Sequence, residues 1–432
     1  IIASSSRKAV QSLWNNLSAK HTFLKSYPYE IEEIKVANGN TLYRLKVGVF
    51  KTREEAAALG SRLKKNQISS IINKIRKNMT KPILAAMLSC EGLTLTEEEK
   101  KLFAEYNPLG VSLFARNFKS KQQAKNLIDE IRETIGRDDV LIAVDEEGGR
   151  VSRLANAGFP VYTSAETLGS IVEICSCWHA VLISKNLRSL GINVNYAPVV
   201  DKKTNPQSEV LTSRCFSADE EEIESRAGIM AETYIDNGIC PCIKHIPGHF
   251  STLNDPHLSV PETELSRWEI EKKTAYLHSF SKFPLAMTSH ILLKSFDAEY
   301  PATQSPKVIS ELIRGYLEFD GFLLSDAIDM HALKGTIAER ASLSIRAGVD
   351  AVCCCSGRIK DLTAVCGERC FMTEKSLQRY ANIKKVIHNK PKCVDVKNIE
   401  LQYKEKIGSI LNVKCSYDAT EVLHQMLKKG ES

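Results

Sequence analysis

From residue 82 onward, short runs of apolar residues alternate with polar turns and with longer stretches in which apolar positions recur at helical spacing. Most of the short runs are continuously apolar, which is typical of strands buried on both faces of a parallel sheet. Capping-box sequences at Thr96 with Glu99 and at Ser120 with Gln123 predict that helices begin there. The expected strands are residues 83–88, 110–114, 140–144, 193–199, 240–243, 284–288, 321–324 and 349–354.

Repeated strand and helix units of this number indicate a (β/α)₈ barrel, the TIM barrel. A doubly wound open sheet is the alternative, but such a sheet usually carries a glycine-rich phosphate turn after its first strand, and Cys90-Glu91-Gly92 is not one. We therefore expect an α/β fold with a TIM barrel over residues 79–385. Residues 386–432 are expected to form a helical tail packed on the barrel, and their sequence indicates no role.

The first 78 residues have a different pattern, which predicts a small α+β domain. The expected elements are a helix containing Trp14, strands over residues 31–36 and 42–50, a helix over residues 53–65 with a capping box at Thr52 and Glu55, and a strand over residues 68–75. This order is that of a ferredoxin-like fold without its first strand. Residues 43–56 closely resemble SPOR domains, which bind peptidoglycan glycan strands stripped of peptide. The resemblance implies glycan strands as a partner and a chain that is cut within the first strand of the domain.

The composition narrows the classes of partner. Apolar residues make up 43% and charged residues 25% of the chain, as in an ordinary soluble globular protein. Lys and Arg number 58 against 52 Asp and Glu, and this surplus is too small and too evenly spread to favour nucleic acid or an anionic membrane surface. No apolar run in the sequence approaches the roughly 20 residues that cross a bilayer.

The 13 cysteines do not fit a disulfide framework. Three of them are consecutive, at residues 353–355, and the pairs at residues 175 and 177 and at residues 240 and 242 are too closely spaced for the usual C-x₂-C zinc pair. We interpret the cysteines as buried, reduced thiols that act as small hydrophobic residues. This interpretation favours a reducing compartment.

Polar residues follow several of the expected strands. The carboxyl ends of the strands in a barrel meet at one rim, where the active sites of this fold lie. Each of these residues alone is more often a hydrogen-bonded core residue, but several converging on one rim indicate a site. They are Arg116 and Asn117 after the second strand, residues 145–150 after the third, Lys244 and His245 after the fifth, His290 after the sixth and Asp326 after the seventh.

Residues 244–257 concentrate histidines, a lysine and an aspartate among proline and glycine breaks. A zinc site formed by His245, His249 and His257 is one interpretation of this segment. The spacing of these histidines matches neither the helical pattern of zinc enzymes nor a Cys/His finger, and the proline–glycine pair after His245 prevents a helix there. We therefore expect no metal.

Residues 144–151, 244–257 and 324–330 together resemble bacterial β-N-acetylglucosaminidases of glycoside hydrolase family 3, and the resemblance runs from about residue 82 to at least residue 356. Larger members of that family carry a second α/β domain after the barrel, for which this chain is too short. The resemblance therefore implies the single-barrel branch, which removes N-acetylglucosamine from anhydro-muropeptides during peptidoglycan recycling. It implies an exo-acting, retaining hydrolase without a cofactor.

The resemblance also implies roles for individual residues. Asp326 matches the nucleophile that forms a covalent glycosyl-enzyme. His257 matches a histidine that acts as acid and base from a mobile loop, and Asp255 matches the aspartate that holds it. Phe250 and Pro256 replace the family's usual glycine and serine, which puts the geometry of this loop in question. The sugar-binding positions are matched by Asp145, Arg150, Arg214, Lys244 and His245.

Two other functions are compatible with the sequence. A protein that has lost turnover and only binds wall glycan would carry the same SPOR-like module and barrel. A barrel aldolase would use Lys244 to form a Schiff base. The compartment is also open, because a SPOR-like module implies the periplasm, whereas the recycling branch and the unpaired cysteines imply the cytoplasm. The chain begins with Ile1, and a start at Met79 would yield a free hydrolase.

Overall fold

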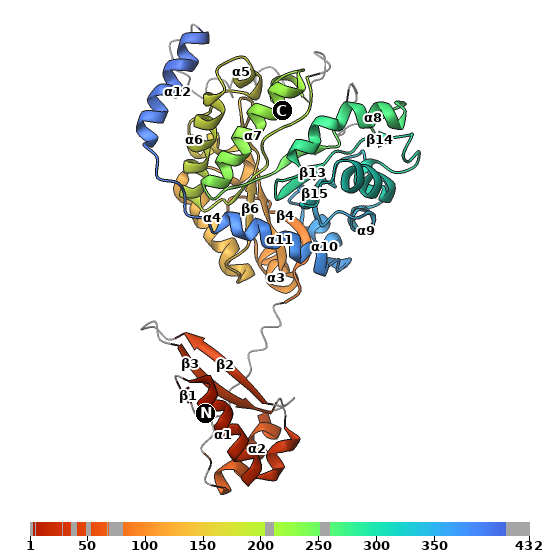
Figure 1. The fold of residues 1–432 in the computed structure, drawn as a ribbon. Coiled ribbons are helices and arrows are strands. Elements are labelled where there is room, and N and C mark those ends of the chain that lie inside the picture. Colours follow the sequence, from red (N-terminus) through yellow and green to blue (C-terminus); the bar gives the residue numbers. More distant parts are fainter. Residues whose placement is uncertain are drawn as a thin grey trace. The chain divides into compact units, whose positions relative to one another are not determined.

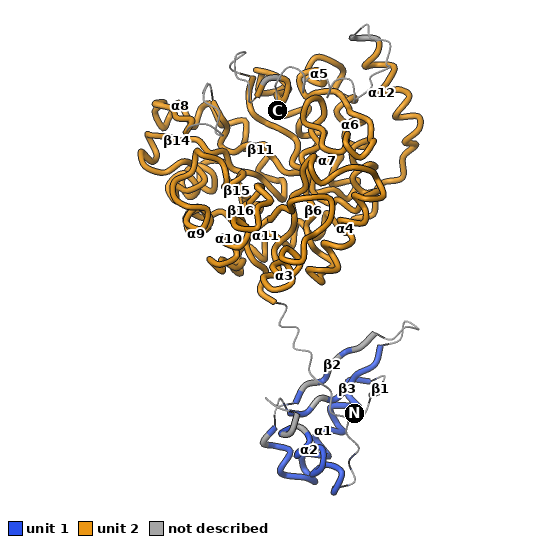
Figure 2. The backbone as a smooth tube through the Cα atoms, turned by 180° about the vertical axis from the view of Figure 1, so that it is seen from behind, with its two compact units in different colours: residues 1–80 blue, residues 81–432 orange. Residues whose placement is uncertain are grey.

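The computed structural model describes residues 3–4, 6–27, 29–35, 41–48, 53–66, 68, 81–203, 211–250 and 260–411. The chain divides into two compact units, residues 1–80 and residues 81–432 (Figure 2). Each unit has its own hydrophobic core. Within the described ranges, no helix is both long and apolar enough to span a bilayer.

The first unit is built on a three-stranded antiparallel sheet with the strand order β1-β3-β2. Both expected helices and the two expected central strands are present. The expected last strand lies outside the described residues except for Ile68. Thr52 of the expected capping box also lies outside them. The core residues are Trp14, Leu24, Leu59 and Leu63. The elements are β1 (Ala3–Ser4), α1 (Arg7–Lys20), η1 (Thr22–Ser26), β2 (Tyr29–Lys35), β3 (Thr41–Val47) and α2 (Arg53–Lys65).

The second unit is a barrel of parallel strands surrounded by helices (Figure 1). The sheet order is β10-β9-β6-β5-β4-β16-β15-β13-β11. Only Cys242 separates β10 from β11, so the two ends of the sheet are halves of one strand, and the barrel closes there. The strands are β4 (Leu84–Ser89), β5 (Pro108–Leu113), β6 (Leu141–Val144), β9 (Val194–Asn195), β10 (Cys240–Pro241), β11 (Ile243–Ile246), β13 (Leu285–Thr288), β15 (Phe322–Ala327) and β16 (Ala351–Cys353).

The strands expected in the barrel are all present, which confirms the α/β class and the TIM barrel. The observed bounds of every strand differ from the expected ones by at least one residue, and two strands also differ in their regularity. The strand expected over residues 193–199 is regular only at Val194–Asn195. The strand expected over residues 240–243 is split at Cys242 and runs on to Ile246, because its first half pairs with β9 and its second half with β13.

The helices begin at residues whose side chains cap them. Thr96 and Glu99 form the expected reciprocal capping box at α3, and Ser120 accepts a hydrogen bond from the Gln123 amide at α4. The second box is not reciprocal, because the Gln123 carbonyl accepts from the Lys119 amide instead. The main helices are α3 (Glu97–Tyr106), α4 (Lys121–Ile135), α6 (Ile174–Leu190), α7 (Glu220–Asp236), α8 (Arg267–Thr274), η7 (Val308–Tyr316), α9 (Ile337–Ala347), α10 (Ile359–Gly367) and α11 (Glu374–Ile387).

Alternate residues of the strands face two different apolar layers. In β4, Leu84 belongs to the layer between strands and helices, whereas Ala85 belongs to the barrel interior. The interior layer is extended by Tyr380 of α11, whose hydroxyl donates to the backbone carbonyl of Asp139 just before β6. Helix α11 therefore closes the end of the barrel at which the strands begin, which leaves the opposite rim for the polar residues.

The chain continues beyond α11 into a further helix, α12 (Val396–Leu411), which packs against α6 (Figure 1). Tyr403 of α12 is buried, with 5% of its surface exposed. The cysteines in the described part of the chain are all free thiols, and most of them are buried. Their burial agrees with the interpretation that they act as small hydrophobic residues.

Candidate active site

Polar residues from several strands converge at the carboxyl rim of the barrel. Asp145 follows β6, Lys244 and His245 lie in β11, and Asp326 lies in β15. Arg214 reaches the same region from η4 (Thr212–Arg214), a turn between β9 and α7. The fold therefore brings together five residues that the sequence analysis selected from distant segments.

A buried ion-pair network occupies part of this rim. The Nζ atom of Lys244 lies 2.6 Å from Oδ1 of Asp145 and 2.7 Å from Oε1 of Glu147. Arg214 donates from Nε and Nη2 to the two carboxylate oxygens of Glu147, at 2.9 and 2.8 Å. The side chains of Lys244 and Glu147 are only 2% and 6% exposed. Glu147 therefore holds two cations in place in a region from which water is largely excluded.

The charges in this network stabilise one another's ionised forms. Burial raises the pKa of Glu147, but the charges of Arg214 and Lys244 outweigh burial and hold this pKa far below its usual value. Burial lowers the pKa of Lys244, but Asp145 and Glu147 outweigh burial, so the net shift is upward. Lys244 is thus a protonated ammonium that donates hydrogen bonds. A protonated amine cannot form a Schiff base, which argues against the aldolase alternative.

Asp201, a residue that the sequence analysis did not select, orients two histidines. It lies just after the bridge that pairs Val199 with Lys244. Its Oδ2 accepts hydrogen bonds from the amide and Nδ1 of His245, at 3.1 and 2.7 Å. Its Oδ1 accepts from the amide and Nδ1 of His249, at 2.9 and 3.1 Å. Because a carboxylate only accepts, both Nδ1 atoms carry hydrogen, and Nε2 of each ring faces other groups.

The protonation states in this cluster follow from burial and charge. Burial raises the pKa of Asp201, but His249 and His245 outweigh burial and hold it well below the usual value. Burial, followed by the neighbouring His249, lowers the pKa of His245 against the opposing influence of Asp201. His245 is therefore a neutral imidazole at pH 7. With hydrogen on Nδ1, it presents the lone pair of Nε2 toward Asp326.

Asp201, His245 and His249 are also residues that could hold a metal ion. Their ligand atoms lie within 4.8 Å of one another, and one carboxylate with two imidazoles is a ligand set that zinc accepts. The zinc set considered from the sequence had His257 in place of Asp201, and His257 lies outside the described residues. The hydrogen bonds from both Nδ1 atoms already satisfy the two oxygens of Asp201.

Asp326 has the geometry of a nucleophile. Its Oδ1 accepts a hydrogen bond from the Ala327 amide at 2.7 Å, and its Oδ2 lies 3.8 Å from Nε2 of His245. The side chain is 15% exposed, so one oxygen is fixed while the other can meet a ligand. Burial raises the pKa of Asp326, but His245, His290 and the Ala327 amide outweigh burial and hold it below the usual value. The carboxylate is therefore ionised at neutral pH.

Other polar residues at the rim support the backbone. His290 donates from Nε2 to the Ala327 carbonyl at 2.9 Å and so holds the end of β15. Asp329 accepts from the Cys355 amide at 2.8 Å. Arg116, which was expected at the site, donates to the carbonyl oxygens of Cys90 and Cys355 at 3.1 and 2.8 Å. Its neighbour in the expected set, Asn117, bonds the same Cys90 carbonyl at 3.1 Å.

The remaining three residues selected from the sequence, Asp255, His257 and Arg150, stay predictions. Asp255 and His257 lie outside the described residues, as does Pro256. Arg150 is exposed, in the turn between β7 (Glu146–Gly148) and β8 (Val151–Ser152). Arg153, three residues further on, has a buried Nε atom without a hydrogen-bond partner in the described part of the chain. A buried polar atom without a partner is unfavourable unless a ligand completes it, so the Nε atom of Arg153 adds this residue to the candidates.

The sequence held signals for two residues to which the prediction gave no individual role, Glu147 within the polar run 145–150 and Asp201. Glu147 follows Asp145 by two positions in an extended segment, so both side chains point to the same side of the chain. Asp201 is the first polar residue after the expected strand over residues 193–199, and the rule that selected Asp326 would have selected it. The buried Nε of Arg153 left no comparable signal.

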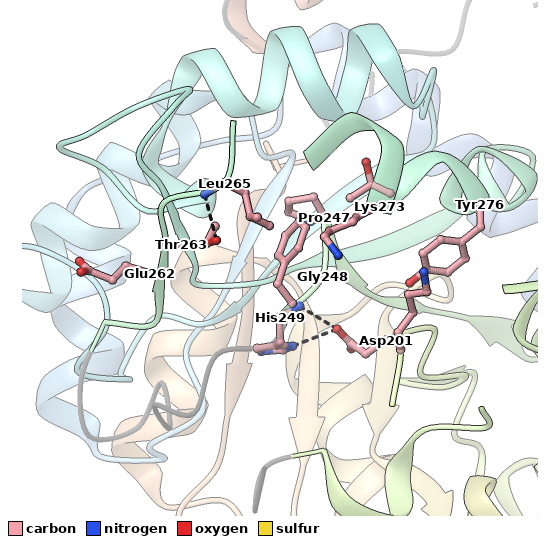
Figure 3. Close-up of a pocket in the computed structure, with 12 residues that line it drawn as sticks. Asp201, Pro247, Gly248, His249, Glu262, Thr263, Leu265, Lys273 and Tyr276 are labelled. Carbon is pink, nitrogen blue, oxygen red and sulfur yellow. Dashed lines mark hydrogen bonds and ion pairs between the residues drawn. The ribbon is translucent and has the colours of Figure 1, made fainter. Parts of the chain in front are cut away.

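A cavity of about 270 Å³ adjoins the histidine cluster (Figure 3). Asp201 and His249 form part of its wall, and Lys273 and Tyr276 form another part. Phe250 also lines it and has a φ of 53°, in the left-handed region that favours the glycine expected from the family. Neither Lys244 nor Asp326 contributes to the wall, so the cavity lies beside Asp326 and not around it.

Comparison with known proteins agrees with this geometry. Residues 42–381 match the family model described as the glycosyl hydrolase family 3 N-terminal domain, and residues 1–73 match the SPOR domain. The β-hexosaminidase of Bordetella avium is 31% identical over 298 residues, which are 66% of this chain and 84% of that protein. The β-hexosaminidase of Pseudomonas aeruginosa strain LESB58 is 30% identical, over 68% of this chain and 92% of that protein.

Solved structures show the same relationship. NagZ from Neisseria gonorrhoeae, in complex with N-trifluoroacetyl-D-glucosamine, has a TM-score of 0.64 at 27% identity, over 74% of this chain and 93% of that chain. A glycoside hydrolase family 3 β-N-acetylglucosaminidase from Paenibacillus sp. strain FPU-7 has a TM-score of 0.67 at 25% identity, over 74% of this chain and 67% of that chain. The family expected from the sequence is thereby confirmed, and the chain, a glycoside hydrolase, belongs to glycosyl hydrolase family 3.

Proposed function

We propose that this protein is a retaining exo-β-N-acetylglucosaminidase that removes terminal N-acetylglucosamine from peptidoglycan fragments, the anhydro-muropeptides. The environment of Asp326 carries the proposal. This ionised carboxylate on a family 3 barrel has one oxygen bound by the Ala327 amide and the other facing His245. The similarity to β-hexosaminidases and to a NagZ bound to a glucosamine derivative supports the choice of sugar.

The ion-pair network is suited to binding the sugar. Of the three N–H groups of Lys244, two are taken by Asp145 and Glu147, which leaves one for a sugar hydroxyl. Asp145 and the Nε2 lone pair of His245 can accept hydrogen bonds from other hydroxyls. We assign Arg214 to the same task. Because these groups are already paired and buried, they need little reorganisation when the sugar binds.

The chemistry then proceeds in two steps. The open oxygen of Asp326 attacks the anomeric carbon, the glycosidic bond breaks, and a covalent glycosyl-enzyme forms. We assign the proton donor for the leaving oxygen to His257, with Asp255 orienting its ring, on the family resemblance. A histidine titrates close enough to neutrality to give a proton in this step and to take one from water in the next. The attack of that water on the anomeric carbon releases the sugar and restores Asp326.

The parts of the chain have separate tasks in this proposal. We assign binding of glycan strands to residues 1–78, catalysis to residues 79–385, and support of the barrel to residues 386–432. The match of residues 1–73 to the SPOR domain supports the first assignment. A glycan-binding module linked to the hydrolase would raise the effective concentration of the enzyme near its substrate.

Hydrolysis of 4-nitrophenyl N-acetyl-β-D-glucosaminide by the full chain tests the proposal. We expect turnover by the wild type and none by Asp326→Ala. Asp329→Asn is the matched control, because this carboxylate lies three residues away and, among the described residues, accepts from the Cys355 amide, which an asparagine oxygen can also do. The control is expected to keep nearly full activity. Proton NMR of the first product is expected to show the β-anomer, as retention requires.

Each part of the proposal has an outcome that would contradict it. Formation of the α-anomer first would exclude retention. Faster release of N-acetylglucosamine from chitooligosaccharides than from anhydro-muropeptides would contradict the assigned substrate. A wild-type chain that binds glycan strands but hydrolyses neither substrate would favour the alternative function, a non-catalytic peptidoglycan-binding protein.

A further inference from the structure

The helix at the end of the described chain, α12, contributes a buried side chain to a row of hydrogen bonds that leads to the candidate active site. The hydroxyl oxygen of Tyr403 lies 3.0 Å from Nδ1 of His179 in α6, and it accepts a hydrogen bond from the Thr163 amide at 3.3 Å. Nε2 of His179 lies 3.1 Å from the backbone carbonyl oxygen of Glu147. Glu147 is the residue whose carboxylate binds Lys244. Two hydrogen bonds thus separate α12 from the ion-pair network.

Only one direction of donation satisfies every atom of this row. The Glu147 carbonyl can only accept, so His179 carries a hydrogen on Nε2. Burial lowers the pKa of His179 to about 4, so the ring is neutral and its Nδ1 is an acceptor. Tyr403 therefore donates its hydroxyl hydrogen to Nδ1, while its oxygen receives the Thr163 amide. Removal of this hydroxyl would leave a buried ring nitrogen unpaired, which is unfavourable.

The same histidine ring limits the space around the turn that carries Glu147. Gly148 has a φ of +96°, and a Cβ atom there would lie 2.8 Å from Cε1 of His179 and 2.2 Å from the Thr163 carbonyl oxygen. The next residue, Gly149, donates from its amide to the Tyr162 carbonyl at 2.8 Å. The backbone next to Glu147 therefore lies so close to the His179 ring that only a glycine fits there, and the hydrogen bond joins the same ring to the Glu147 carbonyl.

We propose that Tyr403 and His179 are positioning residues for the sugar-binding cations. They fix the backbone of Glu147, and the Glu147 carboxylate in turn fixes Lys244 and Arg214. This inference rests on the proposed function, because it supposes that these cations bind N-acetylglucosamine. It makes α12, for which the sequence indicated no role, a part of the structure that sets the geometry of the site.

Tyr403→Phe tests this role, because it removes one hydroxyl and keeps the ring. Tyr380→Phe is the matched control: Tyr380 is also a buried tyrosine of the C-terminal helices, and its hydroxyl also serves a backbone acceptor, the Asp139 carbonyl, at the opposite end of the barrel. Both variants are expected to lose thermal stability, since each loses the hydrogen bonds of one buried hydroxyl. Only Tyr403→Phe is expected to lower kcat/KM for the chromogenic N-acetylglucosaminide, by about tenfold or more, because small displacements of binding groups are costly.

A second variant shows whether the Tyr403 hydroxyl acts through the imidazole ring of His179. If it does, the double variant Tyr403→Phe with His179→Leu is expected to lose no more activity than His179→Leu alone. Equal kinetics of Tyr403→Phe and Tyr380→Phe, or independent losses in the double variant, would overturn the inference.

Titration of the full chain with N-acetylglucosamine separates this inference from the proposed function. A chain that binds the sugar, binds it about tenfold more weakly after Tyr403→Phe, and hydrolyses nothing would refute the hydrolase and support the positioning role. If the wild type hydrolyses the substrate and Tyr403→Phe leaves this activity unchanged, the hydrolase is supported and the positioning role is refuted. A wild-type chain that does not bind the sugar at all would overturn both.

Discussion

Replacement of Glu147 by glutamine is the most direct perturbation of the ion-pair network. In the wild-type protein two carboxylates, Asp145 and Glu147, face two cations, Lys244 and Arg214, so the buried charges balance. Glu147→Gln preserves the shape of the side chain but leaves one positive charge without compensation. It also turns one acceptor oxygen into an amide donor that faces the donors of Lys244 and Arg214.

The expected cost follows from the burial of the network. Removing one partner of a buried ion pair costs about 3–5 kcal/mol, because the remaining charge stays buried without a counter-charge. Glu147 accepts hydrogen bonds at 2.7, 2.8 and 2.9 Å from two cations, so we expect the upper half of that range. At about 2–4 °C per kcal/mol for a domain of this class, the melting temperature should fall by about 10 °C or more.

The pH dependence of this cost has a definite sign. The ordinary pKa of a glutamate is 4.5, and the pKa of Glu147 in the folded chain lies far below that value because of Arg214 and Lys244. Its ionised form therefore contributes full stability above about pH 4.5, and the contribution declines as the pH falls further. Glutamine does not titrate. The stability difference between the wild type and Glu147→Gln should be constant from about pH 8 to pH 5 and should narrow in acid.

Thermal and urea unfolding of both chains across this pH range measure the difference. Glu232→Gln is the control, because Glu232 pairs with Lys282 at 2.6 Å but the two side chains are 58% and 60% exposed. Such a surface pair contributes about 0–1 kcal/mol. A Glu147→Gln chain within about 1 kcal/mol of the wild type, or a difference that widens in acid, would refute the reasoning.

Three further substitutions test other parts of the site. Asp201→Asn presents an amide donor to one of its two histidines. We expect kcat/KM, measured between about pH 5 and 9, to fall by about 100-fold and its pH profile to change. Unchanged kinetics would show that the carboxylate does not orient His245. Arg153→Ala is expected to raise KM by about tenfold in steady-state assays, because its buried Nε awaits an acceptor, whereas a larger effect of Arg150→Ala would support the role implied by the family resemblance. Burial raises the pKa of Glu146 to about 7. Between the ordinary glutamate pKa of 4.5 and this value, the Glu146 carboxyl is protonated in the folded chain and ionised in the unfolded chain. The wild type should therefore lose roughly 3 kcal/mol relative to Glu146→Gln as the pH rises from about 4 to 8 in chemical denaturation, and a difference independent of pH would contradict this.

The order and type of the barrel elements could be predicted from the sequence because their signals are local. A continuous apolar run such as residues 321–324 and a capping box such as that at Thr96 each act over a few residues. The limits of the strands could not be predicted in the same way. The break at Cys242 arises because the two halves of that strand pair with different neighbours, and closure of the barrel decides which neighbours those are.

The residues of the candidate site also fall into two groups, those that the sequence predicts and those that only the tertiary structure identifies. Asp326 and Lys244 could be selected from the sequence, since the ends of parallel strands carry their side chains to one rim in any barrel of this order. The partners of these residues could not be selected. Lys244 meets Asp145 across 99 residues, and Tyr403 meets His179 across 224 residues. Which donor meets which acceptor depends on distances and angles within narrow limits. The packing of the whole barrel sets those distances, and no local pattern along the chain encodes them.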